Sequence, residues 1–258
     1  MTIEPAYMLS GLAVGAIVGL TGVGGGSLMT PLLILLFGIH PATAVGTDLL
    51  YAAVTKSVGT AVHGASHTVE WRIVGRLALG SVPATVLTLL LISWLHFDTA
   101  TAGAMTTWIL APALCATAVV LLFRPLIDAR FGQSLANVAP DRTRGFTIAI
   151  GAVLGALVSL SSVGAGALGA TALMLLYPRL PVSRIVGSDI AHAVPLTLIA
   201  GIGHWYFGLT NLTILGWLLM GSIPGIILGS YAAPRIPDRV LRYTLAGTLL
   251  IAGTRLVL

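Results

Sequence analysis

Long apolar segments fill almost the whole chain, and short polar connections separate them. A helix needs about 20 apolar residues to cross a bilayer, and six segments have that length: 44–66, 73–95, 100–123, 186–208, 212–232 and 239–257. Two further segments, 6–39 and 145–177, are too long for one span and too short for two comfortable ones. The pattern predicts an all-α integral membrane protein.

Each of the two longer segments contains a break of small residues near its centre, at Gly22–Ser27 and at Ser162–Ala167. The order of residues that follows is also shared between the halves. Three further pairs of positions match: Gly46–Leu49 with Gly187–Ile190, His63 with His204, and Gly80–Pro83 with Gly221–Pro224. Two copies of one unit, each with a broken helix, are typical of transporters built from internal repeats.

The composition excludes a soluble protein. The chain is 57% hydrophobic and 8% charged, whereas a soluble domain carries roughly 25% charged residues. The first residues include Glu4 and no basic group, so we expect no cleaved signal and a first apolar segment that stays in place. Cys115 is the only cysteine, which excludes intramolecular disulfides and thiolate metal clusters.

The arginines report the topology rather than a nucleic-acid partner. They lie in or beside the short connections, and such basic clusters mark the cytoplasmic side. If each broken segment is a hairpin that returns to its own side, every arginine except Arg255 falls on one face. We therefore predict both termini outside the cytoplasm and a cytoplasmic linker, 124–144, between a repeat at 1–123 and a repeat at 145–258.

This topology gives each repeat an odd number of spans, so the two repeats are inverted. Each would contain one Gly-rich hairpin and three transmembrane helices, about ten helical segments in all. The two hairpin tips then approach the midplane from opposite sides. Each tip presents backbone N–H groups and a helix N-terminus, which together favour a small anion.

The candidate substrate-binding residues are those of the tips, where glycine permits close approach to a ligand: Gly24, Gly25, Gly26, Ser27, Ser161, Ser162, Gly164 and Gly166. The alternative is that these small residues only allow close packing of transmembrane helices. No Lys-Ser/Thr follows the first glycines as it does in a P-loop, so a nucleotide site is not expected.

Lys56 lies in the middle of the segment 44–66. A lysine at the centre of a membrane costs about 2.5–3.5 kcal/mol on insertion scales, so it needs a counter-charge or a watery cavity. One interpretation is a structural pair with Asp48, and the other is a cationic contact with an anionic substrate. Its counterpart in the second repeat is Thr197, so the site would be asymmetric.

Five further residues are candidates for coupling or gating. Asp48 and Asp189 each stand near a helix start, where they would either cap the helix or couple transport to a cation. His63 and His204 would be either packing residues or titratable groups. His192 lies deeper and beside Asp189, which makes it the better candidate for a proton. No metal-ligand spacing occurs, and we expect neither a metal nor a cofactor.

The pattern Gly22–Ser27 followed by Pro31 resembles the TauE/SafE sulfite exporter family. The pair Gly46-Thr47 and the His63 segment before Val69–Trp71 fit this resemblance, as does the degenerate second copy. It covers nearly the whole chain. It implies transport of sulfite, sulfonates or related small anions across the bacterial inner membrane, by a carrier without an energy-transducing domain.

The expected function is therefore a multi-pass secondary transporter of the inner membrane that exports a small sulfur-containing anion by alternating access. A passive anion channel is the alternative. An intramembrane enzyme would need a nucleophile–base pair or a metal cluster, and the sequence offers neither clearly. The expected partners are the anion and the lipid bilayer, not nucleic acid, and a homodimer stays open.

Overall fold

A computed structural model describes residues 4–21, 26–95, 99–136, 140–164, 166–232 and 238–256. Within these residues the protein is all-helical, as the apolar pattern predicts. The helices are α1 (Glu4–Thr21), α2 (Gly26–Leu35), α3 (Pro41–Ala65), α4 (Trp71–Leu95), α5 (Thr99–Ala136), α6 (Pro140–Ser161), α7 (Ala167–Leu176), α8 (Val182–Tyr206), α9 (Leu212–Ala232) and α10 (Asp238–Arg255).

The two broken segments form α1–α2 and α6–α7, and their arms are unequal. The first arms have 18 and 22 residues, and the second arms have 10 residues each. The breaks lie where the sequence places them, but the arms are unequal, because α2 and α7 end at Leu35 and Leu176 and α6 already begins at Pro140. At 1.5 Å per residue an arm of 10 residues reaches about 15 Å, so α2 and α7 end far short of a full crossing.

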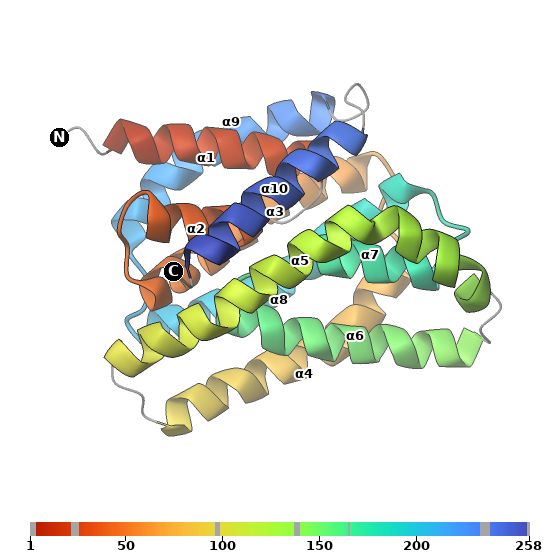
Figure 1. The fold of residues 1–258 in the computed structure, drawn as a ribbon, viewed down its shortest axis with the longest axis horizontal. Coiled ribbons are helices and arrows are strands. Elements are labelled where there is room, and N and C mark those ends of the chain that lie inside the picture. The colour runs from red at the N-terminus through yellow and green to blue at the C-terminus, as the bar shows by residue number, and fades with distance from the viewer. Residues whose placement is uncertain are drawn as a thin grey trace.

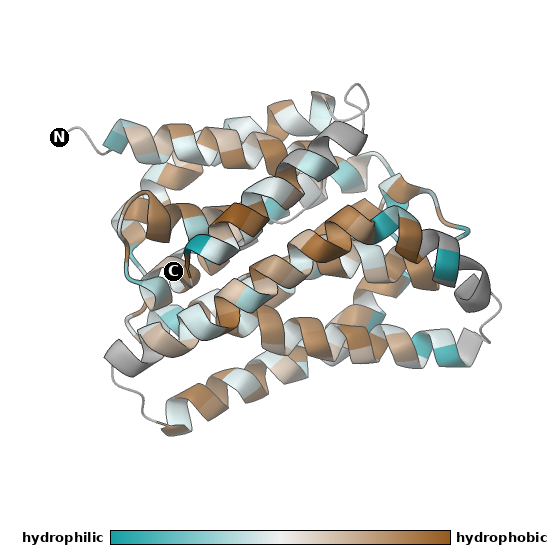
Figure 2. Cartoon of the chain, in the orientation of Figure 1, coloured by the Kyte–Doolittle hydropathy of each residue, from teal (hydrophilic) through white to brown (hydrophobic). Residues whose placement is uncertain are grey.

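Six described stretches are long and apolar enough to span a membrane: α1, α4, Gly103–Ile127 of α5, Arg142–Ser161 of α6, α8 and α9. The expected spans at 44–66 and 239–257 are present as α3 and α10, but they are not among these six. Large apolar side chains cover the outside of the bundle; Trp94 and Trp108 are 76% and 75% exposed. Such a surface suits lipid rather than water. Figure 2 shows hydrophilic residues gathered at helix ends, most clearly at the right-hand ends of α5 and α6.

The helices pair across the two halves of the chain. α1 packs against α9, α4 against α6, and the central helices α3 and α8 against each other. Glycine allows the closest crossings. A Cβ at Gly80 of α4 would lie 1.9 Å from the carbonyl oxygen of Ile148, and one at Gly221 of α9 would lie 1.8 Å from that of Met8. These crossings are the small-residue packing typical of membrane helices.

Both chain ends lie on one side of the bundle. In Figure 1, α1 begins and α10 ends on the left, while α5 ends and α6 begins on the right. The connections α3–α4 and α7–α8 also lie on the right, and α2 leads into α3 on the left. The region expected as a linker, 124–144, is largely helical, because α5 continues to Ala136 and α6 begins at Pro140.

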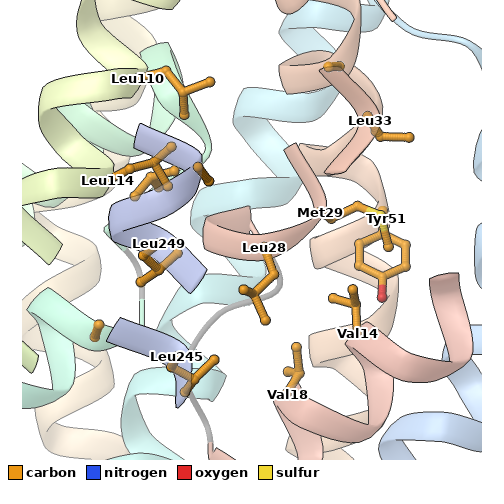
Figure 3. Packing of buried hydrophobic residues seen from close by; sticks show 14 of the residues in the cluster. Val14, Val18, Leu28, Met29, Leu33, Tyr51, Leu110, Leu114, Leu245 and Leu249 are labelled. Atoms are coloured by element: carbon orange, nitrogen blue, oxygen red, sulfur yellow. The ribbon is translucent and has the colours of Figure 1, made fainter. Parts of the chain in front are cut away.

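The main apolar core lies where α1, α2, α3, α5 and α10 meet. Figure 3 shows Met29 of α2 beside the ring of Tyr51 of α3, with Val14 of α1 nearby. Leu245 and Leu249 of α10 pack into the same cluster. This core fixes the short helix α2 against α3, which carries Asp48 and Lys56.

Candidate functional site

The central helices α3 and α8 bury ionisable side chains together. Asp48, Asp189 and His192 are 0% exposed, and Lys56 is 1% exposed. Burying ionisable groups in a membrane protein is expensive, and such groups commonly mark a transport pathway. This group of four residues, hereafter the central cluster, is therefore the candidate site. It combines two sequence candidates from α3 with two from α8.

Asp48 is held by both broken segments. Its carboxylate accepts a hydrogen bond from the Thr30 hydroxyl of α2 and one of 2.9 Å from the Ser162 hydroxyl, which follows α6. Ser162 has a φ of 59°, a conformation that residues other than glycine rarely adopt. The strained turn at Ser162 thus connects the second hairpin to the carboxylate of the first repeat.

Lys56 lies two helical turns beyond Asp48, and its charge interacts electrostatically with both Asp48 and Asp189. Carboxyl groups from both halves of the chain therefore act on the lysine, rather than Asp48 alone. A cationic contact between Lys56 and an anionic substrate stays a prediction.

Asp189 stands at the position equivalent to Asp48, but its surroundings differ. Neither of its carboxyl oxygens has a hydrogen-bond partner within the described residues. Gly169 of α7 is so close that a Cβ at that position would lie 2.2 Å from Asp189 Oδ1. The side chain of Asp189 therefore contacts the short arm of the second hairpin without receiving a donor from it.

His192 and Thr55 each connect the central helices to a serine of a flanking helix. His192 Nε2 lies 2.9 Å from the Ser81 hydroxyl of α4, and the Thr55 hydroxyl lies 2.6 Å from the Ser222 hydroxyl of α9. Ser81 and Ser222 occupy matched positions in the two repeats. The flanking helices α4 and α9 therefore touch the central pair through equivalent hydroxyls.

The matched histidines, His63 and His204, have different hydrogen-bond partners. The His63 ring lies 2.9 Å from the Thr68 hydroxyl, in the turn that follows α3. His204 is buried in α8, and its Nε2 donates a 2.9 Å hydrogen bond to the carbonyl of Ser159 in α6. Both contacts are outside the central cluster, so the structure favours packing roles for these two residues.

The tip residues that the structure describes do not share one environment. Gly24 and Gly25 lie outside the described residues, and Gly26 begins α2. Ser27 is buried and lines a cavity of about 400 Å³ between α1, α2 and α10, and its hydroxyl has no hydrogen-bond partner there.

On the second tip, Ser161 donates a 2.8 Å hydrogen bond to the carbonyl of Leu157 within its own helix. Gly164 and Gly166 have φ of 118° and 127°, values that require glycine at a turn. Among the tip residues that the structure describes, Ser162 donates a hydrogen bond to the central cluster, at Asp48.

A second pair of equivalent contacts fixes the ends of α3 and α8. The backbone N–H of Glu70 donates a 2.8 Å hydrogen bond to the Ser188 hydroxyl, and that of Asn211 donates a 3.0 Å hydrogen bond to the Thr47 hydroxyl. Each bond joins one repeat to the other. These hydroxyls immediately precede Asp189 and Asp48, so they hold the carboxyl-bearing turns in place.

Several residues of the site escape sequence reasoning. Thr30, Ser81, Thr55 and Ser222 are ordinary small polar residues in apolar helices, and their local pattern indicates nothing about their partners. The repeat alignment does contain one signal, because Ser81 and Ser222 fall in the matched segments Gly80–Pro83 and Gly221–Pro224. Within the described part of the chain, no group of three or more His, Cys, Asp or Glu side chains could hold a metal ion.

A family model described as "Sulfite exporter TauE/SafE" matches residues 7–256. The chain belongs to the TauE/SafE family. It is a membrane transporter of this family, as the motif at Gly22–Ser27 predicts. The chain is 40% identical to the "Probable membrane transporter protein YjnA" of Bacillus subtilis (strain 168) over 98% of its own length and 99% of that protein.

Two other relatives are more distant. This TauE/SafE chain is 28% identical to the "Probable membrane transporter protein YdhB" of Bacillus subtilis (strain 168), over 94% of its own length and 96% of that protein. It is 26% identical to a "Probable membrane transporter protein" of Xylella fastidiosa (strain Temecula1 / ATCC 700964), over 92% of its own length and 88% of that protein. No solved structure gives a significant match.

Proposed function

We propose that the protein is a secondary transporter of a small sulfur-containing anion, sulfite or an organosulfonate, in the bacterial inner membrane. The observation that carries the proposal is the buried Lys56, whose charge interacts with Asp48 and Asp189, together with the turn at Ser162 that donates a hydrogen bond to Asp48. A buried ammonium group and nearby hydroxyls are groups that recognise an oxyanion. The family description adds sulfite as a substrate class.

We further propose that the repeats at 1–123 and 145–258 are inverted and alternate in access around the central cluster. The packing of α1 on α9 and of α6 on α4 supports this arrangement. In the repeat alignment α1 corresponds to α6 and α9 to α4, so the two contacts are equivalent, as a two-fold axis between the repeats requires. The hairpin α1–α2 starts and ends on the side of the chain termini, and α6–α7 on the opposite side.

The membrane orientation follows from the arginines. The side of the α3–α4, α5–α6 and α7–α8 connections carries Arg72, Arg124, Arg142 and Arg184, and we assign it to the cytoplasm. Both termini then lie outside the cytoplasm. For an anion formed in the cytoplasm, the direction of net transport is export.

The transport proposal is tested by binding and by exchange. Purified protein is titrated with sulfite, sulfate, thiosulfate, taurine and sulfoacetate, and reconstituted protein is assayed for counterflow of the labelled anion that binds. Saturable counterflow supports a carrier, and large unitary currents would indicate a passive channel instead. A neutral solute that binds while every anion fails would contradict the anion site.

Two variants test whether anion binding depends on the positive charge of Lys56: Lys56→Met removes the charge and Lys56→Arg keeps it. The methionine variant should fold but lose anion binding, whereas the arginine variant should keep part of it, because it keeps the charge. A Lys56→Met protein that transports normally would remove Lys56 from the site. The pair of Ser81 and His192 has nucleophile–base geometry, so recovery of a chemically altered substrate would indicate an enzyme rather than a transporter.

A further inference from the structure

Asp48 and Asp189 occupy equivalent positions in the two repeats, but only Asp48 receives hydrogen bonds within the described residues. Both of its bonds, from Thr30 and Ser162, reach Oδ2, and Oδ1 has no partner there. Asp189 is equally buried, and both of its oxygens lack a hydrogen-bond partner within the described residues. A buried carboxylate is stable when donors replace its lost water, and it is costly when none does. The two acids are therefore suited to different ionisation states.

The charged and titratable groups around Asp189 come from a few elements. The charge of Lys56 in α3 acts on Asp189, and it also acts on Asp48 in α3 and on His192 in α8. The buried phenol of Tyr51 in α3 interacts with Asp48. α4 contributes the uncharged Ser81, and its arginines stand in its first turns. The buried residues of α6 and α7 in the described ranges carry no charge, because the charged residues of α6 lie in its first two turns.

This arrangement sets a charge balance. The buried acids Asp48 and Asp189 face one buried lysine, Lys56, in the described part of the chain. With both acids ionised the central cluster has a net charge of about −1, and an arriving anion would be repelled. With Asp189 neutral, Lys56 and Asp48 balance each other, and the anion can approach the ammonium group.

We propose that Asp189 binds a proton whenever the site binds an anion, so that the protein is a proton–anion symporter. This rests on the proposed anion transport. On loading, the proton adds to the Asp189 carboxylate, and Lys56 interacts with the anion in place of the Asp189 charge. On release the anion leaves, the Asp189 O–H bond breaks and the proton departs on the same side. The restored Lys56–Asp189 interaction then lets the empty site change its access.

Several consequences follow from one proton per monovalent anion. The loaded step moves no net charge, so the membrane potential does not drive it. A gradient of one pH unit supports about tenfold accumulation of the anion on the alkaline side. Export of an internally formed anion then runs only while the product of anion and proton concentrations is higher inside the cell.

The first test needs no substrate. Dicyclohexylcarbodiimide attacks carboxyl groups that are protonated in apolar surroundings, and mass spectrometry locates the modified residue. We expect labelling at Asp189 that falls as the pH rises, persists in Asp48→Asn and is absent from Asp189→Asn. Labelling at Asp48 instead, or none at Asp189, would overturn the assignment.

The second test measures coupling with methanesulfonate, which stays ionised and so carries no proton of its own. Proteoliposomes alkaline inside by one pH unit should accumulate it about tenfold, with the membrane potential clamped. Asp189→Asn should lose this accumulation, and the rate of its remaining counterflow should no longer depend on pH. Asp189→Glu should recover part of the accumulation. Wild-type counterflow without pH-driven accumulation would refute the symport while leaving anion transport intact.

Two controls complete the design. His63→Gln, which lies outside the central cluster, should keep pH-driven accumulation. If His192→Gln loses coupling while Asp189→Asn retains it, the proton belongs to His192 and the proposal is overturned. If methanesulfonate shows no counterflow, the same comparison is made with whichever anion of the binding panel does. A protein in which no anion exchanges fails as a transporter, and carbodiimide labelling then still decides the state of Asp189.

Discussion

The Ser162 hydroxyl, at the turn between α6 and α7, donates a 2.9 Å hydrogen bond to the carboxylate of Asp48 in α3. This single contact joins the broken helix of the second repeat to the central helix of the first. It requires the left-handed backbone at Ser162, which a serine adopts at an energetic cost. The contact links the hairpin tip to the group that balances the charge of Lys56.

Ser162→Ala should lower the apparent affinity for the anion. Asp48 would lose one of its two donors, and losing a hydrogen bond to a buried charge costs about 1.5–3 kcal/mol, or roughly tenfold or more in affinity. Titration of the purified variant measures the change. Ser161→Ala is the matched control, because that hydroxyl bonds within its own hairpin. Equal losses in both variants would mean that the whole tip, not the bond to Asp48, sets the affinity.

Gly169→Ala should disturb Asp189 directly. The new Cβ would lie 2.2 Å from Asp189 Oδ1, and such overpacking typically costs about 1–3 kcal/mol. Thermal unfolding in detergent should show a lower midpoint, and pH-driven transport should fall with it. In an Asp189→Ala background the same glycine substitution should cost much less, since the clashing oxygen is gone. An equal loss of stability in both backgrounds would place the strain elsewhere in α7.

Gly80→Ala in α4 and Gly221→Ala in α9 should both destabilise the protein. Each added methyl group would meet the backbone of the partner helix at 1.9 Å and 1.8 Å, so the helices must separate. The same helices provide the controls Gly75→Ala and Gly216→Ala, where nothing lies within 4 Å of the added atom. The controls should leave the melting temperature near that of the wild type, and a drop in the controls as large as in the test variants would contradict the crossing geometry.

Thr47→Val should loosen the turn that carries Asp48. The backbone N–H of Asn211 would lose its acceptor, at a cost of about 0.5–1.5 kcal/mol for an ordinary hydrogen bond. Thr47→Ser keeps the hydroxyl and should behave like the wild type. Amide hydrogen exchange at Asn211 reports the contact directly. If exchange there is unchanged in Thr47→Val, the hydrogen bond does not hold the connection in solution.

The topology is tested by single cysteines placed after Cys115→Ala. Leu36→Cys, between α2 and α3, should react with a membrane-impermeant thiol reagent in whole cells, since that side is assigned outside the cytoplasm. Ser66→Cys, after α3, should react only once the membrane is opened. Both positions are exposed in the structure. Reversed labelling at the two sites would invert the orientation, and labelling of both in whole cells would contradict the crossing of the membrane by α3.

The sequence predicts the fold class well because that signal is local. Apolar segments of membrane-spanning length, glycines that interrupt two of them and a shared order of residues in both halves are visible without any contact. Even so, the sequence pattern does not reveal that the arms of the hairpins are unequal. A helix continues as long as its own hydrogen bonds and its packing partner allow, and α1 gains most of its packing from α9 in the other half of the chain.

The match between the two halves predicts the wrong role where equivalent residues have different neighbours in the structure. Matched sequence positions favour the same role for His63 and His204, yet one closes a turn at Thr68 and the other bonds a buried carbonyl in α6. Asp48 and Asp189 diverge in the same way. Which donors reach a side chain depends on the rotation and register of neighbouring helices, and these are set by packing over many residues.

The sequence by itself determined that the chain is an all-helical membrane transporter of the TauE/SafE family with ionisable groups in its apolar segments, and it predicts two inverted repeats. Only the tertiary structure decided that Ser162 reaches Asp48, that Ser81 meets His192 and that Gly169 contacts Asp189 without offering a donor. The physical reason is the distance along the chain over which each effect acts. Hydropathy and backbone breaks act within a segment, whereas hydrogen bonding and charge in a buried site depend on which distant segments are brought together.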